Sequence, residues 1–130
     1  MSRKLLTNIR SNTIGFLYYL MAVLVAISIP VFTSQLEKSR ESTDAANIRS
    51  AYAEVVTKYL ADTSSITITV SQQQKVAGWQ TSPTPVLTYQ GGDGTQATYT
   101  LPSPNATGNF SVGINVASSD GTATPSITAN

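Results

Sequence analysis

Few side chains in this sequence are chemically reactive. None of its 130 residues is cysteine or histidine, which removes thiol chemistry, cysteine-containing metal sites and the commonest general base and nucleophile–base pairs. Asp93 and Asp120 each stand alone before a glycine, whereas a calcium site needs roughly six to eight oxygens, usually from several neighbouring carboxylates. We therefore predict no enzyme activity, no metal and no cofactor, and we interpret the two Asp-Gly pairs as turns.

The charged residues are unevenly distributed. Residues 1–60 carry seven basic and four acidic side chains, a net charge of +3. Residues 61–130 carry Lys75 against three aspartates, a net charge of −2. Because such a segment offers no basic surface to a phosphate backbone, the sequence predicts no direct binding of nucleic acid.

A long apolar segment follows a basic N-terminus. Residues 11–36 contain no charged side chain, and a helix of roughly 20 apolar residues spans a bilayer. Three basic residues and no acid precede the segment. This pattern predicts a cytoplasmic leader over residues 1–13 and a transmembrane helix over residues 14–33, with the remainder outside the cell. A cleaved secretory signal peptide is the alternative interpretation.

The helical pattern continues beyond the apolar segment but becomes one-sided. Ile48, Tyr52, Val55 and Tyr59 are spaced four, three and four residues apart among polar side chains. This spacing is typical of an amphipathic helix, which we predict over residues 34–61. The apolar stripe is expected to pack on another part of the protein.

Two features of this helical region lie outside the stripe. Pro30 lacks a backbone N–H and is expected to kink the helix between its apolar and amphipathic halves. The charges of residues 36–49 are interpreted either as solvated surface or as partners of charges on neighbouring subunits.

After residue 61 the pattern changes to short alternating segments rich in serine and threonine. Two pairs of segments flank Asp-Gly turns and are predicted to be β-hairpins, and Pro125 restricts the last strand to a sheet edge. The segment around Trp79 is predicted to be a loop whose indole packs on the helix stripe. The predicted fold class is α+β, a long N-terminal helix packed on a small antiparallel β-sheet head over residues 62–130. The predicted strands cover residues 65–73, 85–90, 96–101, 109–117 and 122–128.

The segment AVLVAISIPVFTSQLEKSRESTDAANIRSAYAEV, residues 22–55, closely resembles the N-terminal helix of type IV pilins and competence-type pseudopilins, especially those of Gram-positive bacteria. The segment QQQKVAGWQ, residues 72–80, resembles them more weakly. The resemblance implies a pilin-like subunit whose apolar half-helix anchors it in the membrane and later packs in a filament core. It implies as partners other copies of the chain or other pilins, the membrane, a prepilin peptidase and the pilus assembly machinery.

The start of the chain departs from the cleavage and methylation motif of this family. Pilins are cut after a glycine, usually before a phenylalanine, and carry glutamate as the fifth mature residue. Gly15-Phe16 resembles the cut, but Leu20 then occupies the glutamate position. Alignment on Pro30 instead places the cut at residues 8–9 and the acidic position at Thr13. Since neither alignment supplies the acid, we expect the chain as written to assemble poorly.

The sequence thus supports two hypotheses of different classes. The first is a structural subunit of an extracellular type IV pilus or pseudopilus filament at the cell surface, held in the membrane before assembly. The alternative is a monomeric, membrane-anchored extracellular binding module whose threonine-rich head contacts a ligand or surface.

Overall fold

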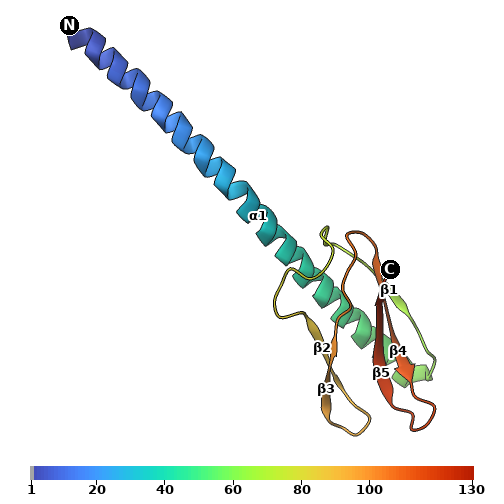
Figure 1. Ribbon diagram of the computed structural model, residues 1–130. Coiled ribbons are helices and arrows are strands. Elements are labelled where there is room, and N and C mark those ends of the chain that lie inside the picture. Colours follow the sequence, from blue (N-terminus) through green and yellow to red (C-terminus); the bar gives the residue numbers. More distant parts are fainter. Residues whose placement is uncertain (1) are drawn as a thin grey trace. The chain divides into compact units, whose positions relative to one another are not determined.

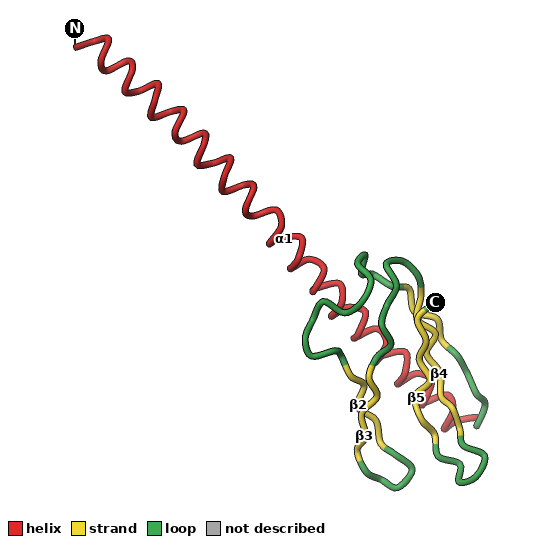
Figure 2. Tube along the Cα trace, in the orientation of Figure 1, coloured by secondary structure: helices red, strands yellow, loops and turns green. Residues whose placement is uncertain are grey.

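The computed structural model describes the backbone of residues 2–130 and their side chains, except those of residues 2 and 4–6. Lys4, one of the basic residues of the leader, lies outside the described side chains. One long helix precedes five strands, as Figures 1 and 2 show. The predicted α+β class with a small antiparallel sheet is therefore confirmed. The elements are α1 (Ser2–Asp62), β1 (Ile68–Ser71), β2 (Val86–Gln90), β3 (Gln96–Thr100), β4 (Asn109–Val116) and β5 (Ala123–Ala129).

The chain divides into two compact units within α1. One ends at Leu36, and the other, which we call the C-terminal unit, comprises Glu37–Asn130. In the first unit the large apolar side chains face outward, with Phe16 61% and Phe32 70% exposed. By its length and composition this part of α1 is able to cross a membrane, and none of its apolar window is buried within the chain.

Three hydroxyls in the apolar part of α1 are satisfied inside the helix. The hydroxyls of Thr13, Ser28 and Thr33 donate to backbone carbonyls three or four residues earlier, at 2.7–3.0 Å. Such bonds suit a helix surrounded by lipid, where no water is present to take their place. Pro30 lies inside α1, which is helical on both sides of it, and a kink there stays a prediction.

The strands form two antiparallel sheets. One has the order β1–β4–β5, and the other is the β2–β3 hairpin. The turns of the two hairpins place Gly94 and Gly121 at φ values of 80° and 71°, a left-handed conformation that glycine adopts without a steric penalty. Both predicted hairpins and their turns are thus confirmed.

Strand β5 forms one edge of its sheet, as Pro125 predicts. Asn109 and Asn130 exchange backbone hydrogen bonds at 3.2 and 2.9 Å. Because bonded and non-bonded pairs alternate in an antiparallel ladder, the backbone of Pro125 and Ile127 faces away from β4. Pro125 has no N–H to offer there, and the carbonyl of Ile127 accepts a hydrogen bond from the Tyr99 hydroxyl at 3.2 Å.

The core of the C-terminal unit lies between α1 and the strands. Trp79 lies beside it, stacked on Phe110 with ring centroids 6.3 Å apart and an interplanar angle of 12°. A core assembled only from residues after Leu36 gives this unit its own source of hydrophobic stabilisation. The buried cluster contains Ala45, Ile48 and Ala51 from α1 and Leu87, Leu101, Phe110, Val112 and Ile127 from the remainder of the unit.

We predict that a chain beginning at Ser34 is a soluble monomer containing both helix and strand, whereas the full chain requires detergent. The uncharged, exposed part of α1 is absent from the shorter chain, while the core remains complete. Circular dichroism and analytical ultracentrifugation measure the two properties. Recovery of the full chain in a detergent-free cytosolic fraction would contradict the membrane assignment.

Candidate functional site

The residues that resemble a prepilin cleavage junction lie on the surface of α1. Phe16 is 61% exposed, and no atom lies within 4 Å of the position that a Cβ on Gly15 would take. No described part of this chain therefore shields the junction from a peptidase.

The residues of the predicted helix stripe and Trp79 differ in how far they are buried. Ile48 and Val55 are fully buried, whereas Tyr52 and Tyr59 are half-buried. Ile48 belongs to the core cluster, and Tyr52 and Trp79 pack against it. The indole Nε1 of Trp79 also donates to the carbonyl of Pro102 at 3.0 Å. Burial raises the pKa of Tyr52, and the nearby Tyr89 raises it further.

Three acidic side chains of α1 hold the segment that follows β1 by its backbone. Glu37, Glu41 and Asp44 form what we call the carboxylate clamp, and residues 72–81 are the clamped segment. Each carboxylate accepts hydrogen bonds from the N–H groups of two consecutive residues. The donors are Gln73 (2.7 Å) and Gln74 (2.9 Å) for Asp44, Lys75 (2.6 Å) and Val76 (2.9 Å) for Glu37, and Gln80 (2.6 Å) and Thr81 (2.9 Å) for Glu41.

The clamp is buried and is neutralised mainly by backbone dipoles. Glu37, Glu41 and Asp44 are 6%, 1% and 0% exposed. Among the described side chains, only Arg40 forms an ion pair with any of them, at 3.3 Å from Glu37. Hydrogen bonds from N–H groups to a carboxylate are stronger than those between neutral groups, so they offset much of the cost of burying the charges.

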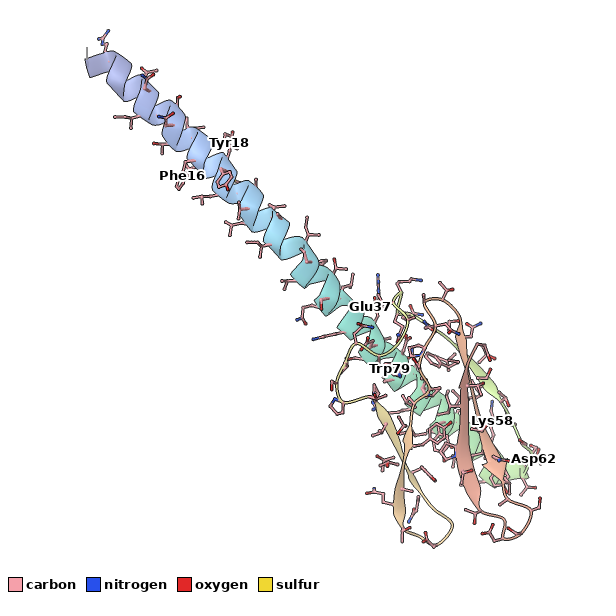
Figure 3. The ribbon with its side chains drawn as sticks, in the orientation of Figure 1. Phe16, Tyr18, Glu37, Lys58, Asp62 and Trp79 are labelled. Carbon is pink, nitrogen blue, oxygen red and sulfur yellow. The ribbon has the colours of Figure 1, made fainter. Side chains whose placement is uncertain are left out.

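Glu37, labelled on α1 in Figure 3, illustrates how these effects balance. Burial raises the pKa of its carboxyl, but the N–H groups of Val76 and Lys75, together with Arg40, lower it by more. The pKa of Glu37 therefore lies below its ordinary value of 4.5. The charged form of Glu37 is favoured because its hydrogen-bond donors are already in place when the protein is folded.

Two buried glutamines brace the clamped segment from within. The amide nitrogen of Gln74 donates to the carbonyls of Val76 (3.0 Å) and Gly78 (3.1 Å), and that of Gln72 donates to the carbonyl of Asn105. The side-chain oxygens of both glutamines have no protein partner among the described residues. The clamp, these amides and Trp79 together fix the segment against α1 and the sheet.

The sequence analysis missed this clamp. The charges of residues 36–49 were interpreted as solvated surface or as partners of charges on neighbouring subunits. For Glu37, Glu41 and Asp44 the first interpretation is wrong, because all three are buried and bound to groups of their own chain. The available signal was spacing, because these acids precede Ile48 by intervals of four, three and four and so extend the apolar stripe backwards. Their partners are backbone N–H groups, which leave no trace in the sequence.

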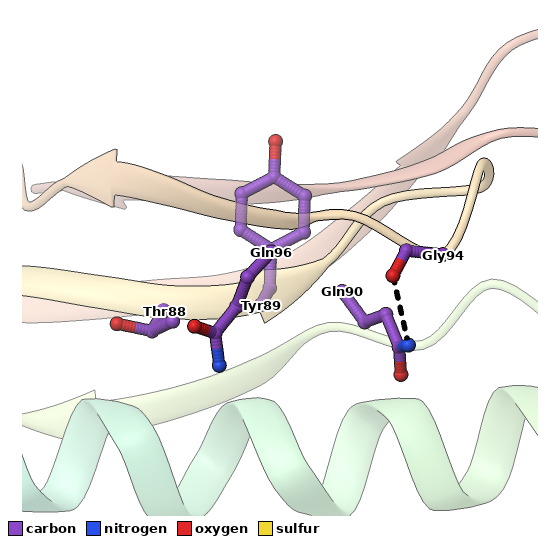
Figure 4. Close-up of a pocket in the computed structure, with 5 residues that line it drawn as sticks. All are labelled: Thr88, Tyr89, Gln90, Gly94 and Gln96. Carbon is purple, nitrogen blue, oxygen red and sulfur yellow. Dashed lines mark hydrogen bonds between the residues drawn. The ribbon is translucent and has the colours of Figure 1, made fainter.

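The β2–β3 hairpin carries a hollow of about 400 Å³. Figure 4 shows Thr88, Gln90 and Gln96 grouped together, with the ring of Tyr89 directed to the other side. The amide nitrogen of Gln90 donates to the carbonyl of Gly94 at 3.2 Å. Its lining residues, Tyr89 included, are uncharged, and the hollow is a polar surface depression with little means of holding a ligand firmly.

The chain matched no family model, no curated protein and no solved structure.

We predict that Asp44→Asn lowers the free energy of unfolding by about 3 kcal/mol, because one buried N–H group would then face an amide donor instead of an acceptor. Urea unfolding followed by the fluorescence of Trp79, the only tryptophan, measures the loss. Glu54→Gln, at an exposed position of α1, serves as the control and should change the value by less than about 0.5 kcal/mol. Equal effects of the two substitutions would contradict the role of the clamp.

We also predict that the contribution of Glu37 to stability depends on pH. Its folded-state pKa lies below the ordinary 4.5, so the unfolded chain binds the proton more readily. The contribution is fully present above pH 4.5 and is lost as pH falls through the folded-state value. Urea midpoints measured across this range should fall less steeply in Glu37→Gln than in the unchanged protein, and parallel profiles would exclude the effect.

Proposed function

We propose that this protein is a structural subunit of an extracellular type IV pilus or pseudopilus filament, anchored in the membrane before assembly. The observation that carries the proposal is the pairing of a fully exposed apolar helix with a compact unit that has its own core. An apolar helix that its own chain leaves uncovered requires lipid or other apolar helices around it. A filament subunit uses both environments in turn.

The chemistry of the C-terminal unit agrees with a structural role. Its buried acids are of the kind that acquire catalytic pKa values in enzymes, but here their oxygens accept hydrogen bonds from backbone N–H groups, from Arg40 and from the Thr81 hydroxyl. They stabilise a fold instead of transferring protons to a substrate. The resemblance of residues 22–55 to pilins supports the same role.

Charge distribution supports an orientation for the anchored state. Arg3 and Arg10 precede the apolar segment, and the first acid in the chain is Glu37. The positive-inside rule then keeps the N-terminus in the cytoplasm and places the C-terminal unit outside. In this orientation Gly15-Phe16 lies near the cytoplasmic side of the membrane. The prepilin peptidase cuts type IV pilins, which residues 22–55 resemble, on that side.

The test is expression in a piliated host that lacks its own major pilin. We expect the unchanged chain to accumulate in the membrane and to enter filaments poorly, because Leu20 occupies the position of the family glutamate. In that family the carboxylate pairs with the new N-terminal amine, and an unpaired buried ammonium costs several kcal/mol. Leu20→Glu should therefore increase the amount of protein in sheared surface filaments.

Leu17→Glu, which places the same charge one helical turn away, is the matched control and should give no increase. Abundant filaments of the unchanged chain would contradict the importance of the missing acid. If neither the unchanged chain nor Leu20→Glu enters filaments, the filament proposal is wrong, and a monomeric membrane-anchored binding module becomes the better description.

A further inference from the structure

The exposed charged side chains of the C-terminal unit that form no ion pair lie mainly at its two ends, where they differ in sign. Arg49 lies between the ends, and Lys58, one turn of α1 before Asp62, pairs with Glu54. Lys38, Arg40 and Lys75 lie at the end where α1 enters the unit, and Glu37 Oε1 binds the backbone N–H of Lys75 there. We call these three residues the basic end. Along α1, Lys38 is 24 residues from Asp62, about 36 Å at ~1.5 Å per residue.

Three aspartates occupy the opposite end, which we call the acidic end. Asp62 closes α1, and Asp93 and Asp120 lie in the two hairpin turns. A Cβ on Gly92 would lie 3.0 Å from the Thr122 hydroxyl, so the two turns are neighbours. Figures 1 and 2 show these turns and the end of α1 at the same end of the unit.

The charges at the two ends are available to a partner. Among the described side chains the ion pairs are Arg40–Glu37 and Lys58–Glu54, so Lys38 and Lys75 pair with no described carboxylate. All three aspartates are exposed. Hydrogen bonds from Thr95 lower the pKa of Asp93, and those from Thr122 lower the pKa of Asp120, so both turns keep their negative charge in mildly acidic solution.

The carboxylate clamp lies near the basic end but does not cancel it at contact distance. Glu37, Glu41 and Asp44 are buried and turned onto backbone N–H groups. Their formal charges weaken the field of the basic end at long range. A surface that touches this end, however, meets the exposed ammonium groups of Lys38 and Lys75 instead of the buried carboxylates.

We infer that the acidic end of one copy of this chain docks on the basic end of another, and that this contact sets the direction of association. The inference rests on the proposed filament function and names its contact surface. The partner is a second copy because the two ends are complementary in sign within one molecule. Contacts between like ends bring like charges together and are disfavoured, so the interface is heterologous and successive copies point in the same direction.

Exposed charge pairs contribute little energy singly, so this contact governs alignment more than affinity. Apart from Arg49 and the paired Glu54 and Lys58 on α1, the remaining surface of the C-terminal unit carries no charged side chain, so the groups at the two ends have the main influence on how two copies orient. The contact should weaken in high salt, where the Debye length shrinks to about 3 Å at 1 M.

The experiment uses the cysteine-free full chain in an uncharged detergent with a short bismaleimide cross-linker. Ser39→Cys lies beside Lys38, and Ser119→Cys lies beside Asp120, so both labels leave every charge intact. Mixing the two single variants permits a cross-link only between copies. Because maleimide coupling is irreversible, the product accumulates even from a weak contact.

We expect the mixed pair to cross-link about tenfold faster than a control pair in which Ser126→Cys, an exposed position within β5, replaces Ser119→Cys. High salt should remove most of the difference. Asp93→Lys/Asp120→Lys in the Ser119→Cys chain should also remove it. Lys38→Glu/Lys75→Glu in the Ser39→Cys chain should then restore it, which misfolding of the charge variants would not do. Unchanged Trp79 fluorescence confirms that each variant is folded.

The possible outcomes separate this inference from the filament proposal. Equal rates for the two pairs, or a rate that charge reversal leaves unchanged, would overturn the contact between acidic and basic ends. If the Leu20→Glu chain enters filaments while the two cysteine pairs cross-link at equal rates, only the inferred contact between the acidic and basic ends is wrong. A preferred cross-link without filaments in the host would retain the contact and reject the filament proposal.

Discussion

The C-terminal unit depends on three carboxylates that meet six backbone N–H groups. The clamped segment has no regular secondary structure, and its donors would otherwise have to find water or remain unpaired. Glu37, Glu41 and Asp44 supply acceptors from a rigid helix at intervals of one turn. The segment in turn places Trp79 against Phe110. Loss of the clamp would therefore disturb the hydrophobic core as well as the loop.

The two parts of α1 carry different side chains on their surfaces and therefore suit different surroundings. Over residues 14–33 the side chains of α1 are mostly apolar on every side, and the hydroxyls of Ser28 and Thr33 bond to its own carbonyls. From Glu37 onward it presents acids, then alanine and isoleucine, toward the C-terminal unit. The first buried charge marks the point at which α1 ceases to be compatible with a lipid core, because carboxylates are costly there.

The local features of this fold were predictable from the sequence, whereas the clamp was not. The hairpins follow from Asp-Gly turns between alternating segments, and Ile48 and Val55 follow from helical spacing. Ala45 and Ala51 were not predicted as core residues, yet both are buried, because a close approach of the helix to the sheet needs small side chains. The burial of the three acids was not predicted, because an acidic residue on a helix is ordinarily expected to be exposed to solvent. Only their backbone partners, some 30 to 40 residues away in the chain, account for their burial.

The protected edge of β5 limits the ways in which crowded copies of this chain can join. A strand laid along that edge finds no N–H at Pro125 and an occupied carbonyl at Ile127. Amyloid-like growth needs an uninterrupted ladder of backbone bonds, and here the ladder is broken at two adjacent outward positions. Backbone pairing along β5 is therefore closed to a second copy, and a cross-β fibre would have to start from another edge, at β1 or in the β2–β3 hairpin.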